Sequence, residues 1–206
     1  DVVMLAAQWE KEFGIIVEQA EDEIAAVNMV LGAWYAGARA MTSTSGGGFA
    51  LMEEAISMSG IGELPLVIHN AMRPGPGTGL PTRTEQGDLN LAMYAGHGDF
   101  PRVLLAPTSL ESGVELGQKA FNIADKYQVP VIILSDANYL SQSMNLGKVN
   151  LEENEYHVVE STEDYKRYQY TESGISPRSV PGYGEGLVKV DSDEHTEEGL
   201  ITEDFD

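Results

Sequence analysis

Cysteine is absent from this sequence of 206 residues, and basic residues are scarce, with 12 Lys and Arg against 33 Asp and Glu. Without cysteine the chain can form no disulfide, and it offers no thiolate for zinc or an iron–sulfur cluster. The formal net charge of −21 argues against direct partnership with nucleic acid and against an anionic membrane leaflet, because both favour a basic surface. No apolar run approaches the roughly 20 residues of a membrane-spanning helix.

Several other signals are missing as well. The N-terminus has neither the basic region nor the small-residue cleavage site of a signal peptide, so we expect a cytoplasmic protein. It also lacks an initiator methionine, and the C-terminus stops without a closing element, which predicts a truncated subunit. The four histidines show no metal-ligand spacing, and the acidic residues lack the calcium-loop pattern. We therefore expect no metal site in this chain.

Acidic residues are concentrated near the C-terminus. Residues 151–206 contain 16 of the 33 acidic residues and only 4 of the 12 basic ones. A solvated, self-repelling surface is one interpretation, and adaptation to a salt-rich cytoplasm is another. From about Leu146 the alternation of helical and strand patterns stops. We predict a domain over residues 1–145, followed by an acidic extended segment over residues 146–206 that leads to a missing C-terminal domain.

The first 145 residues alternate between strand and helix patterns. Helices are predicted at 2–13, 21–35, from the turn at 44–48 to about 59, at 89–94 and at 110–127; strands are predicted at 15–17, 40–43, 64–69, 103–106 and 130–134. Short, nearly continuous apolar strands between helices indicate an α/β fold, a parallel sheet with helices on both faces. Ligands of such sheets bind beyond the carboxyl ends of the strands. Residues 19–23, 43–48 and 69–87 should lie at that edge.

Each of these three segments allows a functional and a structural interpretation. The turn Thr44-Ser45-Gly46-Gly47-Gly48 can present N–H groups to an anion, or its small residues can simply serve a tight turn. The acids Glu21-Asp22-Glu23 can cap a helix, while Glu23 can instead face the ligand edge as a proton-exchanging carboxyl. The Pro- and Gly-rich stretch 73–84 combines arginine with threonine hydroxyls. It suits a planar carboxylate, although a flexible linker has similar composition.

Specific blocks of sequence carry a family resemblance. VEQAEDEIAA at 17–26, residues 32–37, TSTSG at 42–46, the loop at 73–89 and KYQVPV at 126–131 resemble the alpha subunit of 2-oxoacid:ferredoxin oxidoreductases, with the 2-oxoglutarate (KorA-type) branch nearest. The resemblance continues into the tail at 165–168, 174–178 and 193–195. It implies the thiamine-diphosphate-binding fold, with this chain supplying the pyrimidine-binding domain.

The resemblance also implies roles for individual residues. Glu23 matches the glutamate that contacts the pyrimidine ring and acts as a proton relay, the catalytic carboxyl of this chain. Arg73 matches the arginine that binds the substrate carboxylate, and Thr78 and Thr82 match hydroxyls of the same loop. Ser45 and Gly46 are expected near the cofactor.

The sequence departs from the family pattern in three places. The family's Tyr-Pro-Ile-Thr-Pro segment is absent, and Gly46-Gly47-Gly48 replaces an expected Gly-Pro-Gly. The Gly-Asp-Gly motif for magnesium and the cysteines for a [4Fe–4S] cluster are absent as well. In this family, both Mg²⁺ and the cluster belong to the partner beta subunit, without which the chain is expected to be inactive.

The implied activity is oxidative decarboxylation of a 2-oxoacid, 2-oxoglutarate to succinyl-CoA in the nearest branch. Coenzyme A would be the acyl acceptor and ferredoxin the electron acceptor. Two alternatives stay open at this stage. One is a subunit acting on pyruvate or branched-chain 2-oxoacids; the other is a non-catalytic phosphate-binding or scaffold subunit.

Overall fold

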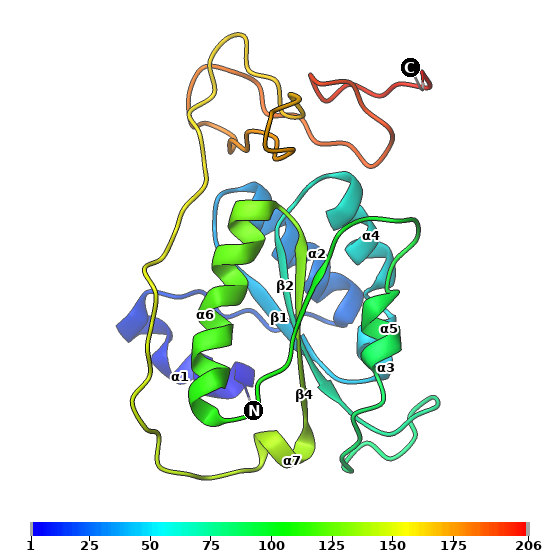
Figure 1. The fold of residues 1–206 in the computed structure, drawn as a ribbon, viewed down its shortest axis with the longest axis vertical. Coiled ribbons are helices and arrows are strands. Elements are labelled where there is room, and N and C mark those ends of the chain that lie inside the picture. The colour runs from blue at the N-terminus through cyan, green and yellow to red at the C-terminus, as the bar shows by residue number, and fades with distance from the viewer. Residues whose placement is uncertain (1, 205–206) are drawn as a thin grey trace.

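The computed structural model of the chain describes residues 2–204 and is organised around one parallel sheet (Figure 1). The strands β1 (Met41–Thr44), β2 (Leu66–Met72), β3 (Val103–Leu105) and β4 (Pro130–Asp136) lie in the order β1-β2-β4-β3. The helices are α1 (Val2–Phe13), α2 (Glu23–Tyr35), α3 (Gly47–Ala50), α4 (Glu53–Ile61), α5 (Leu89–Met93), α6 (Leu110–Tyr127) and α7 (Ala137–Leu140). The predicted α/β fold with a parallel sheet is confirmed.

The two central strands hold the core together. β2 and β4 pair from Leu66 opposite Pro130 to Met72 opposite Asp136, and every residue of β4 is buried. Burial on both faces explains their nearly continuous apolar sequence. Their carboxyl ends point to the lower end of Figure 1, where β4 runs into α7. That end is the edge at which the sequence predicts a ligand site.

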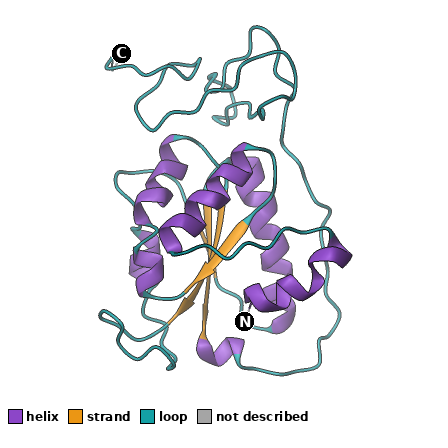
Figure 2. Cartoon of the chain, turned by 180° about the vertical axis from the view of Figure 1, so that it is seen from behind, coloured by secondary structure: helices purple, strands orange, loops and turns teal. Residues whose placement is uncertain are grey.

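Helices cover both faces of this sheet (Figures 1 and 2). α6 packs against β4 and β2 on one face, while α2 and α4 contact each other and the strands on the other face. The general preference for right-handed crossovers predicts opposite faces for α4 and α6, because α4 connects β1 to β2 in one direction across the sheet and α6 connects β3 to β4 in the other. The side chain of Asp22 accepts a hydrogen bond from the N–H of Ala25 at 2.8 Å, so α2 starts at Glu23 rather than at Glu21.

Two expectations about secondary structure are wrong. Residues 15–17 form no strand, and the side chain of Ile16 is 85% exposed. The backbone N–H groups of Ile15 and Val17 bond instead to the carbonyl and side chain of Glu10, which ties this segment to α1 rather than to the sheet. The helix expected up to residue 59 is also divided, because a turn at residues 51–52 separates α3 from α4.

After α7, residues 141–204 form no helix and no strand longer than an isolated bridge. The first part of this segment runs beside α6 (Figure 1). Side chains along α6 form hydrogen bonds to the backbone of this segment. Glu111 accepts from the N–H of Gly147 at 2.8 Å, and Gln118 bonds to both the N–H and the carbonyl of Glu152. Acidic residues of α6 therefore accept hydrogen bonds from the segment, an arrangement that composition alone does not reveal.

The second part of the segment covers the upper end of the sheet in Figure 1, opposite the predicted ligand edge. Two of its arginines are almost completely buried there. Arg167 donates to the carbonyls of Gly62 and Glu63, and Arg178 bonds to the carboxylate of Asp125 on α6. Buried charged side chains need such partners, so these contacts fix the segment on the core.

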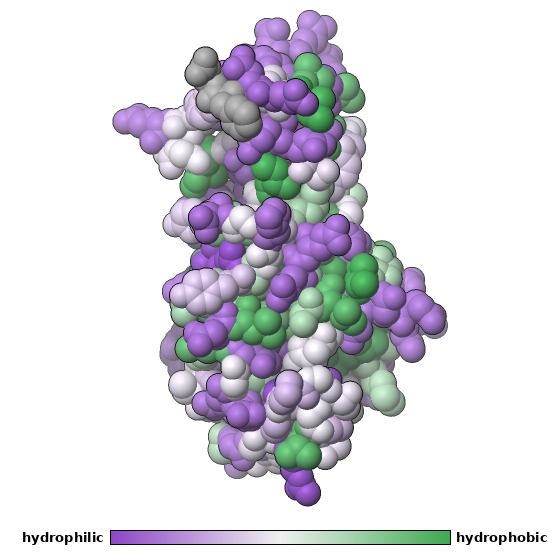
Figure 3. All heavy atoms as spheres, turned by 90° about the vertical axis from the view of Figure 1, so that its right-hand side faces the viewer, coloured by the Kyte–Doolittle hydropathy of each residue, from purple (hydrophilic) through white to green (hydrophobic). Residues whose placement is uncertain are grey.

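The surface combines hydrophilic and apolar areas. Figure 3 shows hydrophilic side chains over much of the C-terminal segment and apolar clusters lower down, over the core. α1 buries none of its residues, and its apolar side chains from Val2 to Phe13 are largely exposed. Among residues 2–204, no helix combines the length and apolar character needed to cross a membrane.

Candidate functional site

The candidate site is a glycine turn at the carboxyl end of β1. Residues 45–48 run from this strand into α3, which begins at Gly47, and Gly46 has a φ of +51°, a value that favours glycine. The N–H of Gly48 bonds to the carbonyl of Ser45 at 3.0 Å, which closes the turn. Ser45 is half-buried. The turn therefore lies where parallel sheets bind their ligands.

Glu23 lies against the last glycine of this turn. A Cβ atom added to Gly48 would lie 2.5 Å from Glu23 Oε1, and closer still to Thr44 Oγ1, so no side chain fits at this position without displacing them. The carboxylate of Glu23 is half-buried and forms no hydrogen bond or ion pair with any residue from 2 to 204. Its oxygens are consequently available to a ligand.

Arg73 lies against the first glycine of the same turn. A Cβ atom on Gly46 would approach Arg73 Nε to 2.7 Å and Cγ to 2.9 Å. Nε is buried and has no hydrogen-bond partner within the described part of the chain. An unpaired buried donor costs about 1–3 kcal/mol, and an acceptor supplied by a ligand would remove that cost. Arg73 thus matches the requirements of an anion-binding side chain.

The loop that follows Arg73 is attached at its returning limb. Gln86 donates to the carboxylate of Asp136 at 2.7 Å, and Thr84 Oγ1 accepts from the N–H of Asn138 at 3.3 Å. The pKa of Asp136 is lowered, chiefly by a hydrogen bond from the N–H of Tyr139. Asp136 therefore stays ionised and continues to accept the hydrogen bond from Gln86 of the loop.

Thr78 and Thr82 belong to the loop that follows Arg73. Both are exposed on the loop, and neither forms a hydrogen bond to another residue of the range 2–204. The structure thus brings Glu23, Ser45, Gly46 and Arg73 to one turn, whereas the two threonines are exposed. Their role as hydroxyls that line the site stays a prediction.

One histidine and one asparagine, His69 and Asn70, interrupt the apolar sequence of β2. His69 is buried between the hydroxyls of Ser43, at 2.8 Å, and Ser135, at 2.7 Å, and burial lowers its pKa. A neutral imidazole bonded to hydroxyls on the two neighbouring strands has a structural role in the sheet. Asn70, its neighbour, accepts a hydrogen bond from the N–H of Gly46 at 3.3 Å. The sequence reading missed Asn70, although an amide inside an apolar strand is itself a signal.

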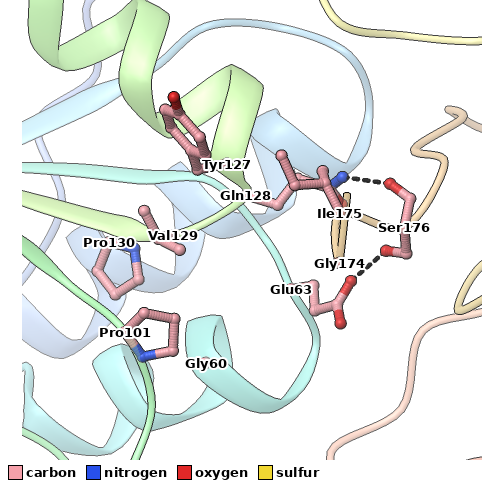
Figure 4. A pocket seen from close by; sticks show the side chains of 10 residues that line it. All are labelled: Gly60, Glu63, Pro101, Tyr127, Gln128, Val129, Pro130, Gly174, Ile175 and Ser176. Carbon is pink, nitrogen blue, oxygen red and sulfur yellow. Dashed lines mark hydrogen bonds between the residues drawn. The ribbon is translucent and has the colours of Figure 1, made fainter. Parts of the chain in front are cut away.

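A cavity of about 150 Å³ lies away from this turn, between the core and the C-terminal segment (Figure 4). Glu63, Gln128 and Ser176 line it, and Ser176 Oγ donates to the carboxylate of Glu63. None of the predicted site residues contributes to its wall. No group of three or more His, Cys, Asp or Glu side chains suited to a metal ion occurs among residues 2–204.

Comparisons with known proteins agree with the resemblance drawn from the sequence. A family model described as pyruvate flavodoxin/ferredoxin oxidoreductase, thiamine diphosphate-binding, matches residues 1–206. The alpha subunit of 2-oxoacid:ferredoxin oxidoreductase 1 from Sulfurisphaera tokodaii is 45% identical over 202 residues, which cover 94% of this chain and 32% of that protein. The 2-oxoglutarate synthase subunit KorA from Archaeoglobus fulgidus is 41% identical over 197 residues, covering 95% of this chain and 51% of that one.

A solved structure has the same fold. It is a 2-oxoglutarate:ferredoxin oxidoreductase from Magnetococcus marinus with 2-oxoglutarate, coenzyme A and succinyl-CoA bound; its TM-score is 0.90 at 38% identity, covering 99% of this chain and 36% of that one. The chain thus spans between about a third and a half of the length of these relatives. Since the family model matches every residue, the chain belongs to the pyruvate flavodoxin/ferredoxin oxidoreductase, thiamine diphosphate-binding family.

Proposed function

We propose that this chain supplies the pyrimidine-binding part of the alpha subunit of a 2-oxoacid:ferredoxin oxidoreductase. The complete enzyme would convert a 2-oxoacid and coenzyme A into an acyl-CoA and CO₂ and pass the electrons to ferredoxin. The observation that carries the proposal is the glycine turn, which Glu23 approaches at Gly48 and Arg73 at Gly46, each with unpaired polar atoms. A proton-relaying carboxyl and a carboxylate-binding guanidinium thus lie two turn residues apart.

The residues of the turn fit thiamine diphosphate. The absence of a Cβ at Gly48 lets the Glu23 carboxylate lie against the turn. No residue from 2 to 204 forms a hydrogen bond or ion pair with the carboxylate oxygens of Glu23. When bound, thiamine diphosphate supplies the carbon nucleophile and the electron sink for decarboxylation of a 2-oxoacid. Glu23 would hold a proton at the pyrimidine ring nitrogen, which is general acid–base work at a fixed position. Ser45 and Gly46 would lie beside the ring.

Arg73 would orient the substrate. A guanidinium holds a carboxylate in a planar, bidentate geometry, and the buried, unpaired Nε is one donor of that fork. Thr78 and Thr82 would add hydroxyls once the loop meets the substrate. We assign 2-oxoglutarate as the substrate because the KorA relative and the solved structure are named for it. Pyruvate and branched-chain 2-oxoacids are the alternatives that a substrate panel would reveal.

The proposed enzyme needs a beta subunit. The relatives are named as alpha subunits, and this chain has no cysteine for a [4Fe–4S] cluster. We therefore place the cluster and the Mg²⁺ that binds the diphosphate in the beta subunit, with ferredoxin as its electron acceptor. The division into a domain over residues 1–145 and an extended segment over 146–206 stays a prediction, as does a cytoplasmic location.

Arg73→Ala tests the substrate side of the site. In the complete enzyme with its beta subunit, we expect the KM for 2-oxoglutarate to rise about 10- to 100-fold, because a charge-assisted hydrogen bond is worth about 1.5–3 kcal/mol. The affinity for thiamine diphosphate should stay unchanged. Steady-state ferredoxin reduction and cofactor titration measure the two quantities. Arg83→Ala, which removes the exposed arginine of the same loop, is the control; a collapse of cofactor affinity in Arg73→Ala would contradict the assignment.

Gly48→Ala tests the cofactor side. The added methyl group would overlap Glu23 Oε1 and Thr44 Oγ1, so the carboxylate must move. We expect the thiamine diphosphate concentration for half-maximal activity to rise about tenfold or more, since overpacking costs about 1–3 kcal/mol. Gly47→Ala is the matched control, because its nearest neighbours would be 3.8 Å away, an ordinary contact. Equal cofactor requirements in the two variants would contradict the geometry.

A further inference from the structure

We propose that Asn70 is a positioning residue for substrate binding, because its amide joins the turn that seats Arg73 to the returning end of the substrate loop. This inference rests on the proposed function of Arg73. It assigns Asn70 no contact with the substrate or the cofactor. Its role would be to fix the distance between two segments that the substrate carboxylate must meet together.

The amide of Asn70 is completely buried in the middle of β2. Its Oδ1 accepts a hydrogen bond from the N–H of Gly46 at 3.3 Å, and its Nδ2 donates to Asp88 Oδ2 at 3.2 Å. A buried amide must satisfy both ends, and here the two partners come from different segments. Asn70 is the one side chain in residues 2–204 that bonds to both of them.

The two partners of Asn70 belong to the glycine turn and to the returning end of the substrate loop. Gly46 is the residue against which the Arg73 side chain lies. Asp88 is the first residue after the loop 73–87 and precedes α5. Arg73 itself follows the end of β2, three residues after Asn70. The loop therefore leaves the sheet and returns to it within reach of one buried amide.

The other anchors of the loop do not touch the turn. Gln86 and Thr84 bind Asp136 and Asn138, which belong to the start of α7. These bonds hold the returning limb to β4 but leave its distance from Gly46 undefined. The Asn70 amide supplies that constraint. Small displacements of an orienting group weaken substrate binding and catalysis strongly, so the constraint should be visible in kinetics.

The experiment exchanges the two side chains in the complete enzyme. Asn70→Asp keeps an acceptor for Gly46 but places a second carboxylate against Asp88. We expect the KM for 2-oxoglutarate to rise about tenfold or more, the cost of an unpaired buried group, with thiamine diphosphate affinity unchanged. Adding Asp88→Asn restores a donor between positions 70 and 88. The double variant should return the KM to within about threefold of the starting enzyme, since the hydrogen bond is re-formed in reverse.

A second variant protects the test against loss of folding. Asp88→Ala removes the same hydrogen bond from the loop side, where Asp88 makes no side-chain capping bond to α5. It should raise the KM about as much as Asn70→Asp while the enzyme still assembles. A normal KM in Asp88→Ala, a failure of the exchange to restore the KM in an assembled enzyme, or a loss confined to cofactor affinity would each overturn the inference.

The proposed function and this inference fail separately. If Arg73→Ala leaves the KM for the 2-oxoacid unchanged, the proposed function of Arg73 fails, whatever position 70 does. If Arg73→Ala raises the KM but the variants at positions 70 and 88 do not, only the inference about Asn70 fails.

Discussion

Glu23→Gln in the complete enzyme should reduce 2-oxoacid-dependent ferredoxin reduction by about 10²- to 10⁴-fold, the usual contribution of general acid–base catalysis. The substitution keeps the size of the side chain that lies on Gly48 but removes its ability to exchange a proton. The fall should appear in kcat, with the KM for the 2-oxoacid little changed, because Glu23 is not proposed to bind the substrate. Initial rates over a range of substrate concentrations measure both.

A direct measurement separates this role from a structural one. Exchange of the C2 proton of bound thiamine diphosphate with deuterium oxide should slow in Glu23→Gln, even without substrate. Glu21→Gln is the matched control, since this exposed carboxylate precedes the helix and its N-cap residue Asp22. Unchanged exchange and unchanged ferredoxin reduction in Glu23→Gln would instead support the non-catalytic scaffold subunit.

Local patterns sufficed for the elements that build the site. β2 and β4 are buried on both faces, and both begin with a run of apolar residues of the kind that indicates a buried strand. α6 has a capping box at Ser109 and Ser112 and ends at Gln128 in the left-handed conformation, so both of its limits have local causes. Once parallel strands were expected, the location of the ligand edge followed from the topology alone.

The residues 15–17 show where such patterns fail. Three apolar residues in a row can enter a sheet only where a strand edge is free to receive them, and the sequence gives no information about that edge. Here Glu10 takes the N–H groups of Ile15 and Val17, so the segment stays with α1. Both hydrogen bonds join residues that are at most seven positions apart in the sequence. Even so, nothing in the sequence around Glu10 distinguishes it from an ordinary exposed glutamate.

Part of the candidate site could likewise be predicted from the sequence, and part of it could not. Family resemblance predicted Glu23 and Arg73 as site residues, and the sheet topology predicted that their segments would meet. The reason for the glycines became visible only in space, because the side chains that need the room at Gly46 and Gly48 belong to other segments. Asn70 and Asp88 are 18 residues apart in the chain. Their pairing depends on how the loop closes, which no local pattern specifies.

Asp125→Asn should release the C-terminal segment from the core. The carboxylate of Asp125 is buried on α6 and accepts hydrogen bonds from Arg39 at 2.9 Å and from Arg178 at 2.5 Å. Removal of its charge takes away the carboxylate with which both arginines form their ion pairs. Loss of one partner from a buried ion pair costs about 3–5 kcal/mol. Because Arg178 belongs to the segment, the loss weakens a contact that joins residues 141–204 to α6.

Hydrogen exchange measures this cost where it arises. The N–H groups of Val159 and Ser161 bond to the carbonyls of Arg178 and Tyr183 within the segment. Because residues 141–204 form no helix and no strand longer than an isolated bridge, we expect these bonds to open when the segment leaves the core. In Asp125→Asn, we expect their exchange in the assembled enzyme to accelerate about 10²-fold or more, as a loss of about 3 kcal/mol requires. Glu155→Gln is the control, because its pairs with Lys126 at 4.0 Å and with His157 at 3.1 Å are both exposed, and such pairs contribute about 0–1 kcal/mol. Equal exchange rates in the two variants would show that the segment is held by its apolar and backbone contacts instead.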